Sequence, residues 1–96
     1  MQRDEALRKL KAAKPFLMSE FGVCRLAVFG STVRNQAHPG SDVDVMVSFD
    51  GPANARRYFG VQFYLEDLLG EPVDLVTDKA LRPELRPYIE RDLTDV

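Results

Sequence analysis

The sequence predicts a small α/β or α+β domain in which helices cover a β-sheet. Stretches with an apolar residue every three or four positions alternate with short, valine-rich apolar runs. The resulting order is helix, strand, short helix, strand, helix, strand, helix, which suits a layer of helices packed on a sheet. The 96 residues allow only one hydrophobic core, so we expect a single domain over residues 1–96.

The first half of the chain alternates helix and strand. The expected elements are a helix over 4–21, a strand over 23–29, a short helix over 32–36 and a loop over 37–40. Gly22 is expected to end the first helix, because glycine adopts the left-handed backbone that closes many helices. The run over 23–29 is β-branched and aromatic, so we expect a buried strand with Cys24 buried inside it.

The second half contains the clearest strand pattern. The expected elements are a strand over 42–49, a turn over 50–52, a helix over 53–69, a strand over 72–77 and a helix over 83–93. Valines occupy alternate positions from Val43 onward, which is the pattern of a strand with one buried face. A helical connection between the second and third strands suits a parallel pair, whereas the first and second strands can pair in either direction.

The composition favours an ordinary folded domain and disfavours several functions. The net charge of −2 argues against a protein that neutralises nucleic-acid phosphates, so no direct DNA binding is expected. The single cysteine excludes an intramolecular disulfide and a cysteine-based zinc site. The N-terminal residues are highly charged, and no apolar run approaches the ~18–20 residues that span a bilayer. We therefore expect a cytoplasmic protein without membrane association.

Aspartates occupy unusual positions on two predicted strands. Asp42 and Asp44 lie on one face of the second strand, roughly 6.6–6.8 Å apart at their Cα atoms. If the third strand pairs beside the second, Asp74 joins them, and three carboxylates can hold two divalent cations such as Mg²⁺ for phosphoryl transfer. The alternative is that these are ordinary solvated aspartates at strand ends, which suits Asp42 alone better than all three together.

A glycine and a serine directly follow the first strand. Gly30 lets the backbone approach a phosphate closely, and Ser31 offers a hydroxyl beside the free N–H groups of a helix start. Arg34 lies on the same side of the turn and can reach a phosphate or the carboxylates. The alternative role of Ser31 is helix capping, and the P-loop pattern is absent. An anion site beside paired carboxylates is what a metal–triphosphate complex requires.

Three segments carry a family resemblance. Residues 28–34, 41–47 and 73–76 have the sequences VFGSTVR, SDVDVMV and VDLV. They resemble the MNT-domain proteins, the minimal members of the DNA polymerase β-like nucleotidyltransferase superfamily, and the similarity covers almost the whole chain. The resemblance implies the polymerase β-like fold, a small mixed β-sheet flanked by helices. Where the family often has glycine after the arginine, this chain has Asn35, which tolerates a left-handed backbone and should preserve the turn.

The resemblance also implies the functional residues and their ligands. The nucleotide-binding set is Gly30, Ser31, Arg34 and Ser41. The catalytic and metal-binding set is Asp42, Asp44 and Asp74. Two Mg²⁺ ions are expected when ATP is bound, and Asp74 is expected to activate the incoming hydroxyl as a general base.

MNT proteins commonly pair with HEPN-domain proteins in toxin–antitoxin systems. The resemblance therefore implies a Mg²⁺-dependent nucleotidyltransferase that moves a nucleotidyl group, with AMP expected, to a protein hydroxyl, as the antitoxin of a HEPN ribonuclease. The alternative is a non-catalytic module that neutralises the HEPN partner by direct binding. A polymerase or tRNA-modifying enzyme is disfavoured by the short, acidic chain. Aromatic residues surround the helix over 53–69, so we expect some of them at a partner contact or in a homo- or hetero-oligomer.

Overall fold

The computed structural model describes residues 1–38 and 40–96 and contains a four-stranded sheet in the order β3-β2-β1-β4. The elements are α1 (Arg3–Phe21), β1 (Val23–Phe29), the 3₁₀ helix η1 (Gly30–Thr32), β2 (Val43–Phe49), α2 (Ala55–Leu69), β3 (Val73–Thr77), the 3₁₀ helix η2 (Asp78–Ala80), α3 (Arg86–Asp92) and β4 (Thr94–Asp95). β2 and β3 pair in parallel, whereas β1 runs antiparallel to both β2 and β4. The predicted mixed sheet with flanking helices is confirmed.

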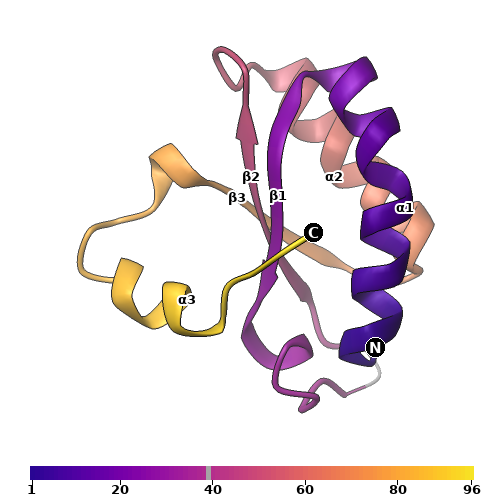
Figure 1. Ribbon diagram of the computed structural model, residues 1–96, viewed down its shortest axis with the longest axis vertical. Helices are drawn as coiled ribbons and strands as arrows, with labels where there is room; N and C mark the ends of the chain where they lie inside the picture. The colour runs from indigo at the N-terminus through magenta and orange to yellow at the C-terminus, as the bar shows by residue number, and fades with distance from the viewer. Residues whose placement is uncertain (39) are drawn as a thin grey trace.

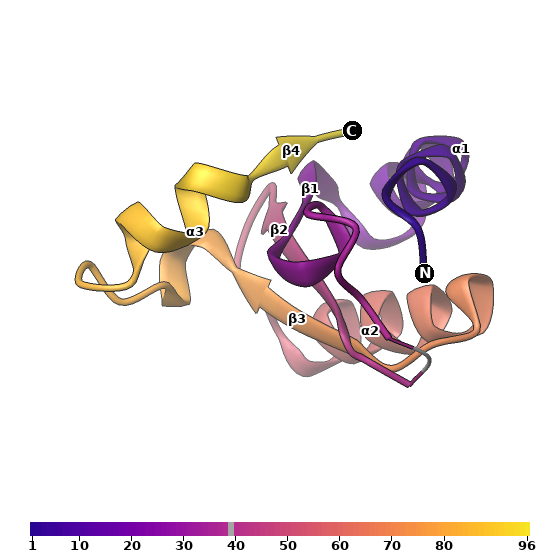
Figure 2. The same ribbon diagram turned by 90° about the horizontal axis from the view of Figure 1, so that it is seen from below.

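The sheet separates two layers of different size. α1 and α2 lie together on one side of the sheet, which we call the inner face, and α3 lies on the other side, the outer face (Figures 1 and 2). Each large helix presents a buried apolar stripe to the inner face. The stripes are Ala6, Leu10, Ala13 and Leu17 on α1 and Val61, Leu65 and Leu69 on α2. Both helices end at a left-handed glycine, Gly22 and Gly70, and the first of these confirms the predicted end of α1.

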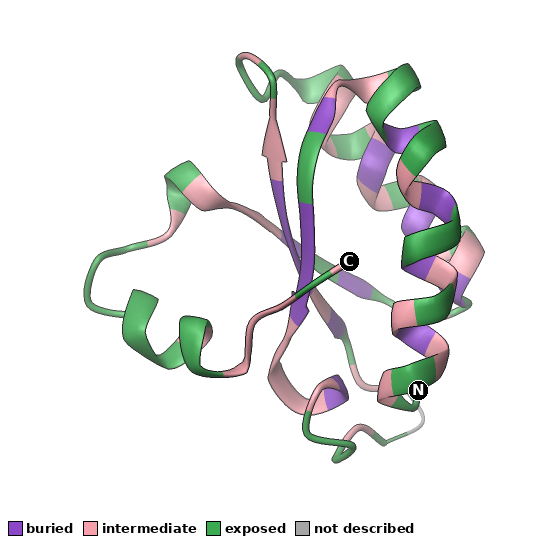
Figure 3. Cartoon of the chain, in the orientation of Figure 1, coloured by how far each residue is buried: buried purple, intermediate pink, exposed green. Residues whose placement is uncertain are grey.

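The hydrophobic core fills the space between the inner face and the two large helices. Val43, Val45 and Val47 of β2 are all buried there, which confirms the alternation predicted for this strand. Figure 3 shows the buried positions gathered along the central strands and the facing sides of α1 and α2. Each fully buried aliphatic side chain contributes about 1.5–3 kcal/mol, so this face provides most of the stability.

The burial predicted for Cys24 is wrong, because its side chain is exposed. Val23 pairs with Phe49 while Arg25 pairs with Ser48, so β1 carries one extra residue at this point. Such a β-bulge reverses the alternation on one side of it. As a result Val23 is buried in place of Cys24.

Two other predicted elements also differ from the structure, and one strand was not predicted. The helical turn begins directly at Gly30 and is a short 3₁₀ helix, not a helix over 32–36. The C-terminal helix is shorter than the predicted 83–93, and the strand β4 that follows it was not predicted. The loop expected over 37–40 includes Pro39, which lies outside the described residues.

β4 is held by side chains from the first third of the chain. Arg25 pairs with Asp95 through Nε and Oδ1 at 2.7 Å, and Lys14 Nζ donates to the carbonyl oxygen of Val96 at 2.7 Å. Over the ranges 1–38 and 40–96, no helix combines the length and hydrophobicity needed to cross a membrane.

Candidate active site

Most of the predicted site residues lie together at one end of the outer face. In the parallel pairing of β2 with β3, Asp44 lies directly beside Asp74. In the antiparallel pairing of β2 with β1, Asp44 lies opposite Phe29, the last residue before η1. The register therefore brings the glycine–serine turn and two of the predicted aspartates together.

Gly30 is packed directly against Asp44. Its backbone is left-handed, with φ of 77°, and a Cβ atom at this position would collide with the Asp44 carboxylate. Any other residue would have to adopt a strained backbone and also displace that carboxylate. Gly30 is thus required by the close approach of the turn to the acidic strand.

The turn after Gly30 is closed by its own backbone. The N–H of Arg34 donates to the carbonyl of Gly30 at 3.4 Å, and the N–H of Gln36 donates to the carbonyl of Ser31 at 2.9 Å. The first N–H groups of a helical turn have no partner within it, which leaves them available to an anion. Asn35 has φ of 55°, so the turn keeps the left-handed residue that the sequence predicts at this position.

Asp44 is held in an unfavourable environment for a negative charge. Its pKa is raised from the ordinary 3.8 to about 6, first by partial burial, then by the charge and hydrogen bonding of Asp74, and then by the charge of Asp42. The positive charge of Arg34 acts in the opposite direction. The three carboxylates therefore lie close enough to repel one another, and a bound cation would relieve that repulsion.

The donor set fits a divalent cation that arrives with a phosphate ligand. Within the described parts of the chain, no three His, Cys, Asp or Glu side chains are gathered closely enough to form a metal site by themselves. Mg²⁺ is usually bound through only one or two carboxylates, and phosphate oxygens and water complete its shell. Asp42, Asp44 and Asp74 would supply hard oxygen ligands beside the glycine–serine turn, which is the chemistry that such an ion needs.

Arg34 connects this turn to the C-terminal helix. Its NH1 atom pairs with the Asp92 carboxylate, and its Nε donates to Oε1 of Gln36 at 3.1 Å. The Asp92 side chain is 18% exposed and the Arg34 side chain 46% exposed, so the contact is partly open to solvent. Sequence reasoning did not find Asp92, because no motif links a residue 58 positions away to the turn.

Ser41 lies in the loop before β2 and is used within that loop. Its Oγ accepts a hydrogen bond from the backbone N–H of His38 at 3.0 Å, and its own N–H donates to the carbonyl of His38 at 2.9 Å. The structure thus gives Ser41 a local structural contact. Its predicted contact with the nucleotide stays a prediction, as do the individual roles of the other site residues.

A mixed sheet with a glycine–serine turn packed against paired aspartates is the arrangement expected of the nucleotidyltransferase class. Residues 10–95 match the family described as nucleotidyltransferase domain, and the chain belongs to that family. The predicted family and enzyme class are therefore confirmed.

Known relatives and solved structures agree with this assignment. Protein adenylyltransferase MntA of Thermococcus cleftensis is 38% identical over 87 residues, which cover 91% of this chain and 88% of that protein. A solved structure described provisionally as a minimal nucleotidyltransferase superposes with a TM-score of 0.81 at 33% identity, covering 100% of this chain and 97% of that chain.

A more distant match shows the same fold. A structure of a tri-AMPylated Shewanella oneidensis HEPN toxin in complex with an MNT antitoxin contains a chain that superposes with a TM-score of 0.64. The identity is 19%, and the match covers 93% of this chain and 68% of that chain.

Proposed function

We propose that this chain is a Mg²⁺-dependent protein adenylyltransferase that transfers AMP from ATP to a hydroxyl group of a HEPN-domain partner. The observation that carries the proposal is the contact of Gly30 with Asp44, which itself lies beside Asp74. It joins an anion-binding turn to the acidic strand pair, as transfer from a metal–triphosphate complex requires.

The residues of the outer face have different roles in the transfer reaction. The turn at Gly30 and Ser31 binds the β- and γ-phosphates through backbone N–H groups, and Arg34 adds a positive charge beside them. Asp42, Asp44 and Asp74 hold Mg²⁺, which neutralises phosphate charge when it is bound.

Asp74 also prepares the acceptor. It takes the proton of the incoming hydroxyl as the oxygen of that hydroxyl forms a bond to the α-phosphorus. The bond from the α-phosphorus to the bridging oxygen breaks, and pyrophosphate leaves with both electrons of that bond. Because Asp74 is exposed on the edge strand β3, an acceptor on a partner protein can approach it from solvent.

The partner assignment rests on the relatives. One relative is named as a protein adenylyltransferase, and a chain with the same fold occurs in a complex of a HEPN toxin with an MNT antitoxin. Exposed aromatic side chains, among them Phe59 and Phe63 on α2, are available for a contact of this kind or for an oligomer.

Label transfer tests the proposal. The purified chain, a HEPN-domain protein as the candidate acceptor and Mg²⁺ are incubated with ATP labelled at the α-phosphate, and an Asp42→Asn/Asp44→Asn double variant serves as the control. We expect label on the partner with the wild type and none with the double variant. A tight complex that forms without labelling would instead support the alternative function, neutralisation of the partner by direct binding.

A further inference from the structure

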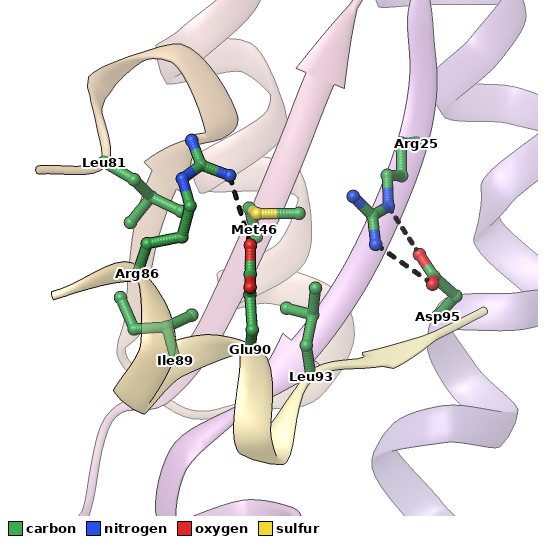
Figure 4. A pocket seen from close by; sticks show the side chains of 8 residues that line it. All are labelled: Arg25, Met46, Leu81, Arg86, Ile89, Glu90, Leu93 and Asp95. Carbon is green, nitrogen blue, oxygen red and sulfur yellow. Dashed lines mark hydrogen bonds and ion pairs between the residues drawn. The ribbon is translucent and has the colours of Figure 1, made fainter. Parts of the chain in front are cut away.

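A cavity of about 260 Å³ lies between α3 and the outer face of the sheet. We call it the α3 cavity. Figure 4 shows Met46 of β2 at its floor, with Leu81, Ile89 and Leu93 projecting from the C-terminal segment around it. Sites for whole small ligands typically measure about 300–1,000 Å³, so the α3 cavity has the size expected for part of a larger ligand.

Two arginines at the rim of the α3 cavity are already neutralised. Arg25 pairs with Asp95 at 2.7 Å, and Arg86 pairs with Glu90 at 3.4 Å (Figure 4). The lining thus contains two guanidinium groups and two carboxylates, so its formal charge is balanced. Apolar walls with hydrogen-bonding groups at the rim suit a flat, uncharged group with polar edges, and a nucleobase has this chemistry.

The strand β2 carries residues of both the α3 cavity and the candidate active site. Met46 follows Asp44 by two positions and projects to the same face, which places their Cα atoms roughly 6.6–6.8 Å apart. A second connection runs through α3, because Asp92 contacts Arg34 in the phosphate turn and the next residue, Leu93, lines the cavity. The cavity therefore adjoins the phosphate turn through two separate elements.

We infer that the α3 cavity binds the base of the nucleoside triphosphate. This inference rests on the proposed function. With the phosphates at the turn and the α-phosphate beside Asp44, the nucleoside extends along β2 toward Met46. The strand residues that line the cavity come from β1, β2 and β4, whereas Asp74, which receives the acceptor, lies on β3. The base and the acceptor thus approach the α-phosphate over different strands.

Filling the α3 cavity tests the inference. In Ile89→Trp the indole occupies the cavity, and calorimetry measures binding of Mg²⁺–ATP and of Mg²⁺–tripolyphosphate, which has no base. We expect the affinity for ATP to fall at least tenfold and that for tripolyphosphate to stay unchanged. The matched control is Leu85→Trp, an equally large change at an exposed position just before α3, which should leave both affinities unchanged. Leu81→Trp fills the same cavity from the preceding segment and should reproduce the result if Ile89→Trp folds poorly.

Three outcomes would overturn the inference. Normal ATP affinity in both filled variants would exclude the base from the cavity, and if transfer to the partner were lost at the same time, the cavity would belong to the acceptor. Equal affinity of the wild type for ATP and tripolyphosphate would show that the base contributes nothing to binding, which excludes a base site but leaves the proposed function intact. Failure of the wild type to bind either ligand would remove both the inference and the proposed function.

Discussion

The two faces of the sheet are built by the same strands but differ in composition and cover. On the inner face, Val43, Val45 and Val47 of β2 are buried beneath two long helices. On the outer face the same strand presents Asp44 and Met46, beneath a helix of only seven residues. Burial on the first face accounts for stability, and the open, charged end of the second leaves room for a ligand. Because side chains alternate between the two faces of β2, one strand contributes both to the hydrophobic core and to the candidate site.

The largest expected effect is a loss of stability from the inner face. Leu65 on α2 is fully buried in the core, so Leu65→Ala removes packed side-chain volume and should lower the free energy of unfolding by about 2–5 kcal/mol. Urea denaturation measures the change. The control is Phe63→Ala on the exposed side of the same helix, and a comparable loss there would contradict the assignment of the core to this face.

The next largest expected effect is a loss of AMP transfer from a change on the outer face. Asp44→Asn keeps the side-chain shape but removes a negative charge from the predicted metal site. We expect transfer of AMP to fall by about 10²–10³-fold, as when a group that stabilises a transition state is lost. Initial rates of label transfer measure this, and circular dichroism should show an intact fold. Activity near the wild-type level would mean that Asp44 does not act in transfer.

Two arginines on opposite sides of the sheet allow a matched comparison. Arg34 pairs with Asp92 beside the turn, and Arg56 pairs with Glu20 between α1 and α2. Arg34→Met should weaken Mg²⁺–ATP binding by about tenfold or more, since hydrogen bonds to charged groups contribute about 1.5–3 kcal/mol. Arg56→Met should leave binding unchanged. Equal effects of the two variants in calorimetry would show only a general loss of positive charge.

The smallest effect is a pH dependence of stability in the metal-free chain. Folding raises the pKa of Asp44 from 3.8 to about 6, so the folded chain binds this proton more tightly than the unfolded chain does. The free energy of unfolding should therefore fall as the pH rises from 3.8 through about 6. Asp44→Asn should therefore gain stability relative to the wild type over this range, by about 1 kcal/mol after allowance for solvent exposure. Urea denaturation in the presence of a chelator measures the difference, and a constant difference across the range would contradict the raised pKa.

The features that could be predicted from the sequence are those set by local periodicity. Alternating valines placed β2 with one face in the core, and apolar residues at helical spacing located α1 and α2. The parallel pairing expected for β2 and β3 was enough to bring Asp44 beside Asp74. The family resemblance added the roles of these residues, which no spacing could supply.

The features that escaped prediction depend on contacts between distant segments. Because of a single extra residue in β1, Val23 is buried and Cys24 is exposed, the reverse of the predicted alternation. Nothing in the apolar run marks that bulge. β4 has only two residues and so no periodicity, and it is held by Arg25 and Lys14 from far along the chain. The α3 cavity and the pairing of Arg34 with Asp92 follow from the same distant docking.

Amide chemical shifts measured by NMR test most directly whether the inner face is structural and the outer face binds the nucleotide. Mg²⁺ and a non-hydrolysable ATP analogue are added to the isotope-labelled chain. We expect shifts concentrated on the outer face, at residues 30–34, around Asp44 and Asp74, with the amides of α1 and α2 that face away from the sheet unchanged. Shifts centred on α1 and α2, or none at saturating ligand, would contradict a nucleotide site on the outer face.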